Sequence, residues 1–287
     1  MMLDRRLLLV SGKGGVGKSA VTAALAIVAA RHGRRVLAVA MTEALGLASH
    51  LGIEALSAEP VQIHPGLFGS VVDRANALDQ YLKLQVRAAR SLPTTQLSKA
   101  LNVLVDTAPG VREIVTMGKP IFEVWEENWD LVVVDAPPLG QLQSYLTAPQ
   151  TITGLIPTGA VREQAARLQT TLGDPEVSGL VLVTTAEELP IVETRQAIAQ
   201  IDKDRQILIA GVLANRVFDP LETPRATIEQ LDPSDARDAG LLHSDLTEQQ
   251  SEWLDAVPDD PRLPYLFDMR TPAEVAERLA DECERLL

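Results

Sequence analysis

The amino-acid sequence predicts an α/β fold built on one doubly wound, mostly parallel sheet. Short runs rich in Val, Leu and Ile alternate along the chain with longer runs of helical periodicity, which is the element order of such a fold. A glycine-rich turn joins the first apolar run to the first helical run. Aromatic residues make up only 3% of the chain, so the core must be aliphatic.

The first three predicted elements form one βαβ unit. Residues 5–12 (RRLLLVSG) are typical of a buried parallel strand, and residues 34–41 (RRVLAVAM) predict the next strand. Between them, Val21, Leu25 and Val28 recur at helical spacing, and Gly33 ends the helix. Such strand–helix–strand connections are right-handed in nearly all proteins.

The remaining elements continue this alternation. Strands are predicted at residues 129–138, 177–190 and 206–217, with a last short strand at 262–269. Helices are predicted at 160–173, 191–202 and 244–257, and residues 151–159 are expected to be a weak strand or a loop. An amphipathic closing helix at 271–287 is capped by Thr271, with Pro272 at its first position.

Residues from about 52 to 128 are less regular than the rest. Helical periodicity at 78–92 and 97–105, and a turn followed by a helix at 109–128, predict a mostly helical insertion. No internal repeat or low-complexity linker divides the chain. We therefore expect residues 1–287 to form a single domain with this insertion at about 52–128.

Composition excludes several classes of function. The formal net charge of −13 disfavours binding to nucleic acid or to an anionic membrane surface. No apolar run reaches the ~20 residues of a membrane span, and the first apolar run is too short for a secretory signal. The one cysteine, Cys283, can form no intramolecular disulfide, and no Cys/His cluster has metal-ligand spacing. We expect a cytoplasmic protein with no nucleic-acid partner and no integral membrane segment.

A phosphate-binding loop is the clearest motif of the chain. Residues 12–19 (GKGGVGKS) match the pattern G-x-x-x-x-G-K-[ST]. Its four glycines lack a Cβ, so the backbone can adopt positive φ and bring its N–H groups against phosphate oxygens at a helix N-terminus. Lys18 is expected to contact the β- and γ-phosphates and the Ser19 hydroxyl to coordinate Mg²⁺. The residues expected to bind the nucleotide here are Gly12, Lys13, Gly14, Gly15, Val16, Gly17, Lys18, Ser19 and Ala20.

Two other interpretations of this stretch are a plain tight turn and the turn of a dinucleotide-binding fold. Gly12, Gly14 and Gly17 have the G-x-G-x-x-G spacing of the latter. Neither interpretation gives Lys18 and Ser19 a role, and no acidic residue ends the run at 34–41 to hold a ribose. The sequence therefore favours a nucleoside triphosphate with Mg²⁺.

Lys13, the second lysine of the loop, gives it the form KGGVGK. This form resembles the deviant Walker A loop of the MinD and ParA partition ATPases, the nitrogenase iron protein and the ArsA-type anion-pump ATPases. The resemblance implies dimerisation, with Lys13 reaching the nucleotide of the partner, where an ammonium can neutralise charge that develops between the β- and γ-phosphates. A solvent-facing lysine is the alternative.

Residues 131–149 indicate which of these ATPase groups the chain resembles most. Asp135 ends a predicted buried strand, where a Walker B carboxylate would serve Mg²⁺, and the text after it is similar to the ArsA-type pattern D-T-A-P-T-G-H-x-L-R-x-L-x-x-P. Residues 109–113 (PGVRE) and 187–198 (EELPIVETRQAI) are similar to segments of the tail-anchored-protein targeting ATPases. The resemblance also places Asn215 where that family has its adenine-contacting Asn.

The chain departs from the family pattern at its first switch. Thr42 stands where the family has the Asp that polarises the attacking water, and Glu43 is an alternative for that role, shifted by one residue. Hydrolysis is therefore expected to be slow or to depend on a partner chain. The family's dimer-clasping Cys-x-x-Cys and its arsenite-binding cysteines are absent, and residues 52–128 are too short and too poor in Met and Phe for a large client groove. We therefore expect neither arsenite pumping nor chaperoning of membrane proteins.

Together these features predict an Mg²⁺-dependent ATPase of the ArsA-like family that acts as a nucleotide-switched homodimer, or as a heterodimer with a related ATPase. Lys13, Lys18 and Asp135 are the expected catalytic residues, with Ser19 and Asp135 at the metal. The alternative is a nucleotide-gated binding module with little turnover, such as the inert half of a heterodimer. A ParA/MinD-type positioning ATPase fits less well, because residues 273–287 carry more acids than bases.

Overall fold

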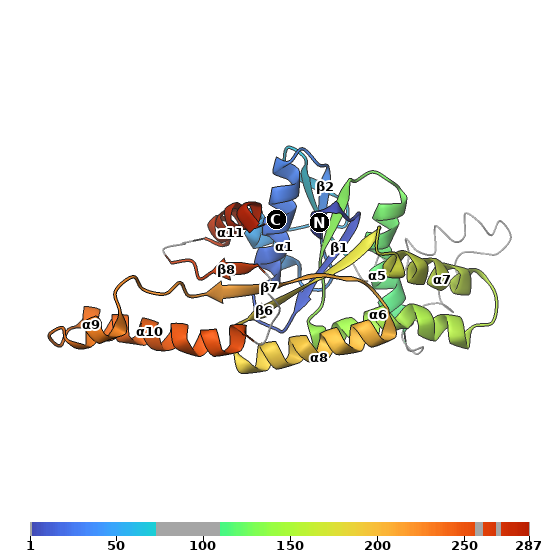
Figure 1. The fold of residues 1–287 in the computed structure, drawn as a ribbon. Coiled ribbons are helices and arrows are strands. Elements are labelled where there is room, and N and C mark those ends of the chain that lie inside the picture. Colours follow the sequence, from blue (N-terminus) through green and yellow to red (C-terminus); the bar gives the residue numbers. More distant parts are fainter. Residues whose placement is uncertain (1, 73–109, 256–260, 268–270, 287) are drawn as a thin grey trace.

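The computed structural model describes residues 2–72, 110–255, 261–267 and 271–286, and the account below refers to these ranges. Their strands form one sheet in the order β3–β4–β2–β5–β1–β6–β7–β8 (Figure 1). Every neighbouring pair is parallel except the hairpin of β3 and β4. The strands are β1 (Leu7–Gly12), β2 (Val36–Ala40), β3 (Val61–His64), β4 (Leu67–Val71), β5 (Leu131–Asp135), β6 (Ser178–Thr185), β7 (Ile209–Val217) and β8 (Arg262–Pro264).

Helices cover both faces of this sheet, which confirms the predicted doubly wound architecture. A short 3₁₀ helix (Met2–Asp4) precedes β1. On one face lie α1 (Lys18–Arg31), α2 (Ala44–His50) and α11 (Pro272–Leu286). On the other lie α5 (Val111–Trp125), α6 (Leu139–Leu155), α7 (Ala160–Gly173) and α8 (Glu188–Asp204). Helices α9 (Arg225–Glu229) and α10 (Asp235–Leu254) follow β7.

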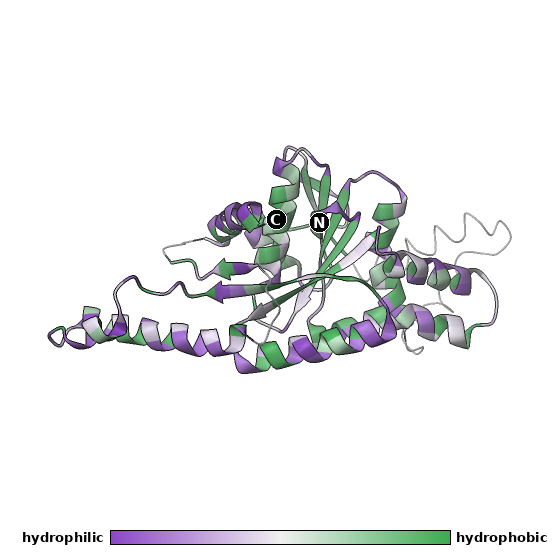
Figure 2. Ribbon diagram, in the orientation of Figure 1, coloured by the Kyte–Doolittle hydropathy of each residue, from purple (hydrophilic) through white to green (hydrophobic). Residues whose placement is uncertain are grey.

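The core is built by strands that are buried on both faces. In β1, Leu7 and Leu9 pack against the α5–α7 side, while Leu8 and Val10 pack against α1 and α11. All four side chains are fully buried, so the strand is a continuous apolar run rather than an alternating one. Figure 2 shows the same pattern, with the hydrophobic residues concentrated on the central strands and on α1.

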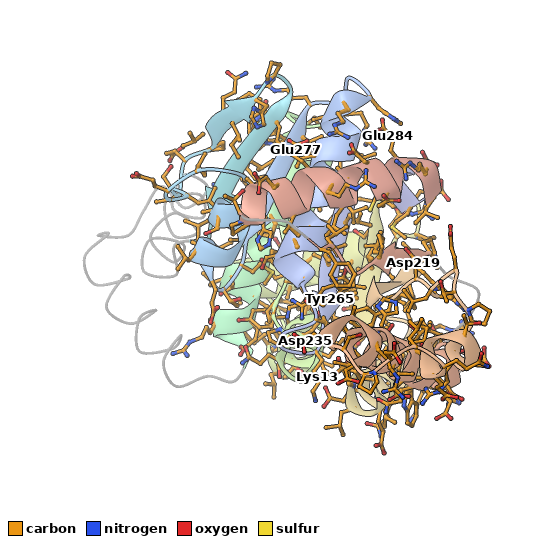
Figure 3. All side chains as sticks on the ribbon, turned by 90° about the vertical axis from the view of Figure 1, so that its left-hand side faces the viewer. Lys13, Asp219, Asp235, Tyr265, Glu277 and Glu284 are labelled. Carbon is orange, nitrogen blue, oxygen red and sulfur yellow. The ribbon has the colours of Figure 1, made fainter. Side chains whose placement is uncertain are left out.

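Helix α11 closes the face that carries α1. The Arg31 guanidinium, in the last turn of α1, pairs with Glu277, Asp281 and Glu284 of α11, and Figure 3 shows Glu277 and Glu284 along α11. The predicted cap of α11 is confirmed, because the Glu274 N–H donates to Thr271 Oγ1 at 3.2 Å and the Thr271 N–H donates to Glu274 Oε2 at 2.9 Å. Cys283 lies on the buried face of this helix, and burial raises its thiol pKa to about 12.

Element ends are shifted in places, as at Glu188–Pro190, which begin α8 although they were expected to end a strand. Two further stretches differ from the expected secondary structure. Residues 61–71, inside the range expected to be mostly helical, form the β3–β4 hairpin; its turn contains Pro65 and Gly66, and Gly66 has φ 80°. Residues 151–155, expected to be strand or loop, continue α6, because Ile152 is buried in the core and the Thr151 hydroxyl donates to a carbonyl one turn earlier. The helices expected at 78–92 and 97–105 lie outside the described residues.

Helix α10 extends away from the sheet with α9 at its outer end (Figure 1). Leu254, in its last turn, is its one buried residue, and most of the helix is hydrophilic (Figure 2). Across the described ranges, no helix combines the length and apolar character needed to cross a bilayer.

Candidate functional site

The site forms at the edge of the sheet where the central parallel strands end. Gly12 ends β1, and Asp135 ends β5 opposite Val10 of β1. Asn215 lies near the end of β7, opposite Thr185 of β6. Because parallel strands end at the same edge, residues that are far apart in the sequence meet around the loop at 13–17.

The loop positions differ in whether, and why, the structure requires glycine there. Gly15 and Gly17 have φ values of 89° and 92°, in the left-handed region that glycine tolerates. Gly12 is required by packing instead, since a Cβ there would overlap the carbonyl oxygen of Val183 in β6. Gly14 has neither constraint, because no atom lies within 4 Å of the position of its Cβ. Of the four glycines at which the sequence permits positive φ, Gly15 and Gly17 adopt it.

Lys18, Ser19 and Asp135 meet at the first turn of α1. The Ser19 hydroxyl donates to Asp135 Oδ2 at 2.6 Å. The Lys18 ammonium donates to the backbone carbonyl of Lys13 at 3.1 Å, so its side chain folds back over the loop. Asp135 is 7% exposed, which makes it a buried carboxylate that depends on these neighbours.

Burial shifts the ionisation of both charged groups. It raises the pKa of Asp135 to about 6, although the Ser19 hydrogen bond and the Lys18 charge act in the opposite direction. Burial also lowers the pKa of Lys18, an effect that Asp135 and Glu43 partly offset. The site therefore places the Lys18 amine near a carboxylate that becomes protonated as the pH falls through about 6.

Helix α2 packs closely on this cluster. A Cβ at Gly46 would lie 3.0 Å from Ser19 Oγ, so a larger residue there would press on the Ser19 hydroxyl. Glu43 directly precedes α2 and lines the cavity above the loop, where its charge acts on both Lys18 and Asp135. Thr42 is half-buried. Of the two residues at the switch position, it is Glu43 that lies at the site.

A cavity of about 750 Å³ opens over the loop, and its volume suits a small organic ligand. The loop forms its floor, with Val16 and Ala20 buried beside it. Its far wall was missed by sequence reasoning: it comes from Arg216, from the segment after β8, and from the start of α11. The wall residues are Arg216, Pro264, Tyr265, Leu266, Thr271, Pro272, Val275 and Leu279.

Asn215 supports the loop from below. Its side-chain Nδ2 donates to the carbonyl of Val16 at 2.8 Å, and the side chain is 3% exposed. It lies directly beneath Gly17, where a Cβ would overlap the carboxamide. Asn215 also lines the cavity, so the residue that supports the loop is accessible to a ligand bound above it.

Aromatic residues gather beyond the far wall. Phe218 stacks on Tyr265 with ring centroids 4.8 Å apart and planes 19° apart, and Phe267 lies 4.9 Å from Tyr265. Tyr265, Pro264 and Leu266 also line a second cavity of about 640 Å³. Aromatic rings within the run 262–269 of an aromatic-poor chain are the one sequence signal that could have indicated this wall.

Lys13 points out of this arrangement. Its ammonium pairs with the carboxylate of Glu193 in α8, and the two side chains are 30% and 40% exposed. Figure 3 places Lys13 in the lower part of the view, separate from Glu277 and Glu284 of α11. In this structure, then, Lys13 contacts its own chain through α8.

The donor set at the first turn of α1 fits a magnesium ion that is held together with a phosphate. Mg²⁺ typically takes only one or two protein oxygens, with phosphate and water supplying the rest, and Ser19 Oγ and Asp135 Oδ2 are two such oxygens side by side. Elsewhere in the described part of the chain, no three His, Cys, Asp or Glu side chains gather as metal ligands.

Comparison with known proteins agrees with this geometry. Residues 5–159 match the family model described as anion-transporting ATPase. The chain is 30% identical over 253 residues to ATPase BagA of Mycobacterium tuberculosis. The matched region covers 83% of this chain and 73% of that protein. The chain is also 29% identical over 231 residues to the arsenical pump-driving ATPase of Acidiphilium multivorum. This matched region covers 71% of this chain and 39% of that protein.

The two kinds of loop glycine give a matched test. Gly17→Ala places a Cβ against Asn215 at φ 92°, so we expect the free energy of unfolding to fall by about 1–3 kcal/mol. Gly14→Ala meets no neighbouring atom and should change it by less than about 0.5 kcal/mol. Urea unfolding of both variants measures the difference, and equal losses would contradict the packing described here.

Proposed function

The chain belongs to the anion-transporting ATPase family, and we propose that it binds ATP with Mg²⁺ over the loop at 12–19, hydrolyses it, and acts as a dimer whose packing changes with the bound nucleotide. The observation that carries this proposal is the hydrogen bond between Ser19 and Asp135, 116 residues apart, beside the Lys18 ammonium. A hydroxyl, a carboxylate and an ammonium at the N-terminus of a helix form a chemical set suited to a triphosphate and its metal.

The loop and Lys18 would hold the phosphates. The N-terminus of α1 presents N–H groups and a positive dipole end to an anion. Lys18 would exchange the carbonyl of Lys13 for phosphate oxygens, which are charged acceptors and bind an ammonium more strongly than a neutral carbonyl does. Ser19 and Asp135 would hold Mg²⁺, which neutralises phosphate charge when bound.

The base would lie toward the wall formed by Tyr265 and Leu266. The Asn215 Nδ2 donates to the carbonyl of Val16. Its Oδ1, the acceptor atom of the carboxamide, would accept a hydrogen bond from the amino group of adenine. The cavity reaches both the loop and this wall, which is the span that a nucleotide requires. We therefore keep the adenine contact of Asn215 as a proposal, in addition to its hydrogen bond to the loop.

A second candidate function is a nucleotide-gated binding module with little hydrolysis. It is favoured by Thr42 at the switch position and by the pairing of Lys13 with its own chain. Glu43 is the carboxylate at the cavity that could orient an attacking water. The arsenical substrate named for the Acidiphilium multivorum relative has no support here, because the one cysteine, Cys283, is buried on the inner face of α11.

Lys18→Ala should weaken ATP binding. A hydrogen bond between charged groups contributes on the order of 1.5–3 kcal/mol, so its loss predicts an affinity reduced by roughly 10- to 150-fold. Isothermal titration calorimetry of ATP with Mg²⁺ measures this change. Unchanged affinity in the variant would remove the proposed site.

Metal dependence should follow the ionisation of Asp135. Magnesium requires the carboxylate form, and the pKa of Asp135 is raised to about 6. The Mg²⁺-dependent gain in ATP affinity should therefore be complete above pH 7 and fall as the pH drops through about 6. Asp135→Asn should bind ATP with no such gain at any pH, and a metal-stimulated affinity retained in this variant would show that another residue holds the metal.

Turnover distinguishes the two candidate functions. If Lys13 acts on the nucleotide of a partner, Lys13→Ala should retain ATP binding and lose at least tenfold in phosphate release, because one stabilising cation is typically worth that much in phosphoryl transfer. Phosphate release by the wild-type chain, measured across protein concentrations, should rise more than linearly. The absence of Lys13-dependent turnover would favour the binding module.

A further inference from the structure

We propose that Glu193 is a positioning residue that holds Lys13 on α8 until a second, ATP-bound copy of the chain takes the lysine over. This inference rests on the proposed dimer. It concerns the state of Lys13 before the dimer forms, which neither the sequence nor the family comparison addresses.

Lys13 is fixed at both of its ends. Its backbone carbonyl accepts a hydrogen bond from the Lys18 ammonium at 3.1 Å, and its own ammonium pairs with Glu193. Lys13 does not contribute to the cavity lining, whereas Gly15, Gly17 and Lys18 do. The two lysines of the loop thus point to different places, Lys18 over its own loop and Lys13 toward α8.

The ion pair lies on a surface with apolar side chains around it. Leu189 and Glu193 are one turn apart on α8, so they share a face, and Val192 adjoins them. Leu189 is 62% exposed and Val192 is 40% exposed. Exposed apolar side chains on the same helix as a charged pair favour a protein partner over open solvent.

Charge selects a second copy as that partner. A copy with ATP bound presents phosphate charge at the same edge of the sheet at which Lys13 emerges. In a two-fold arrangement each Lys13 would face the loop of the other copy, so both ion pairs would be exchanged together. The pair with Glu193 is half-exposed and therefore weak, which makes the exchange for a polyphosphate favourable.

The first measurement needs no nucleotide. Acetylation of Lys13 in the full chain, followed by mass spectrometry, should be about two- to fivefold faster in Glu193→Gln than in the wild type, because a weak exposed ion pair is lost. Lys203, an exposed lysine in the last turn of α8, serves as the internal reference. Glu188→Gln, an exposed change on the same helix, should leave Lys13 unaffected. An equal rate in Glu193→Gln and wild type would overturn the proposal.

The second measurement follows dimer formation by light scattering with ATP and Mg²⁺. Glu193→Gln should dimerise at an approximately two- to fivefold lower protein concentration than the wild type, and high salt should reduce this difference because it screens the pair. In a Lys13→Ala background, Glu193→Gln should have no effect. A shift that persists in that background would show that Glu193 acts on the interface itself, which would overturn its role through Lys13.

The two measurements also separate this inference from the proposed function. Faster acetylation of Lys13 in Glu193→Gln, combined with no ATP-dependent dimer in any variant, would refute the dimer and the takeover of Lys13 while supporting the hold by Glu193. Dimer formation by the wild type with no effect of Glu193→Gln would refute the hold and leave the proposed function intact.

Discussion

A hydrogen bond from the side chain of Asn215 to the carbonyl of Val16 ties the phosphate-binding loop to β7. The loop is otherwise connected to the sheet through Gly12 at its beginning and through α1 at its end. Gly17 can lie against the Asn215 carboxamide only because it has no side chain, and its positive φ turns the backbone into α1. The position of the helix N-terminus, and of Lys18 and Ser19 on it, depends on this support.

Three charged side chains of the site and its loop each contact another group of the chain. Lys18 bonds to a loop carbonyl, Asp135 accepts from Ser19, and Lys13 pairs with Glu193. Each of these contacts is one that a triphosphate, a metal or a partner would replace with a more strongly charged one. On the proposed function, binding would exchange these side-chain contacts while the main chain of the loop stays held by Gly12 and Asn215.

The sequence predicted the part of the site that depends on local spacing. The motif at 12–19 and the strand ending at Asp135 are contiguous patterns, and the parallel sheet brings them together. The wall at Tyr265 could not be predicted, because its place depends on how β8 joins the edge of β7. The partner of Lys13 was equally hidden, since Glu193 lies 180 residues later and only the packing of α8 brings it near.

For the fold, predictions failed where tertiary contacts outweigh local preference. The β-branched residues at 151–153 favour a strand, yet the burial of Ile152 keeps them in α6. The hairpin at 61–71 has few buried side chains in its outer strand, so its apolar pattern is weak, although Pro65 and Gly66 are a turn signal that could have indicated it.

The packing of α11 on α1 has a consequence for the order in which the molecule matures. Asp281 lies 250 residues after Arg31 in the chain, and at ribosomal rates of about 5–20 residues per second that distance takes roughly 12–50 s to synthesise. During this interval one apolar side of α1 has no cover from its own chain, even though the loop that precedes it has already emerged. The side of α1 that packs on α11 is therefore covered only after the last helix has been synthesised.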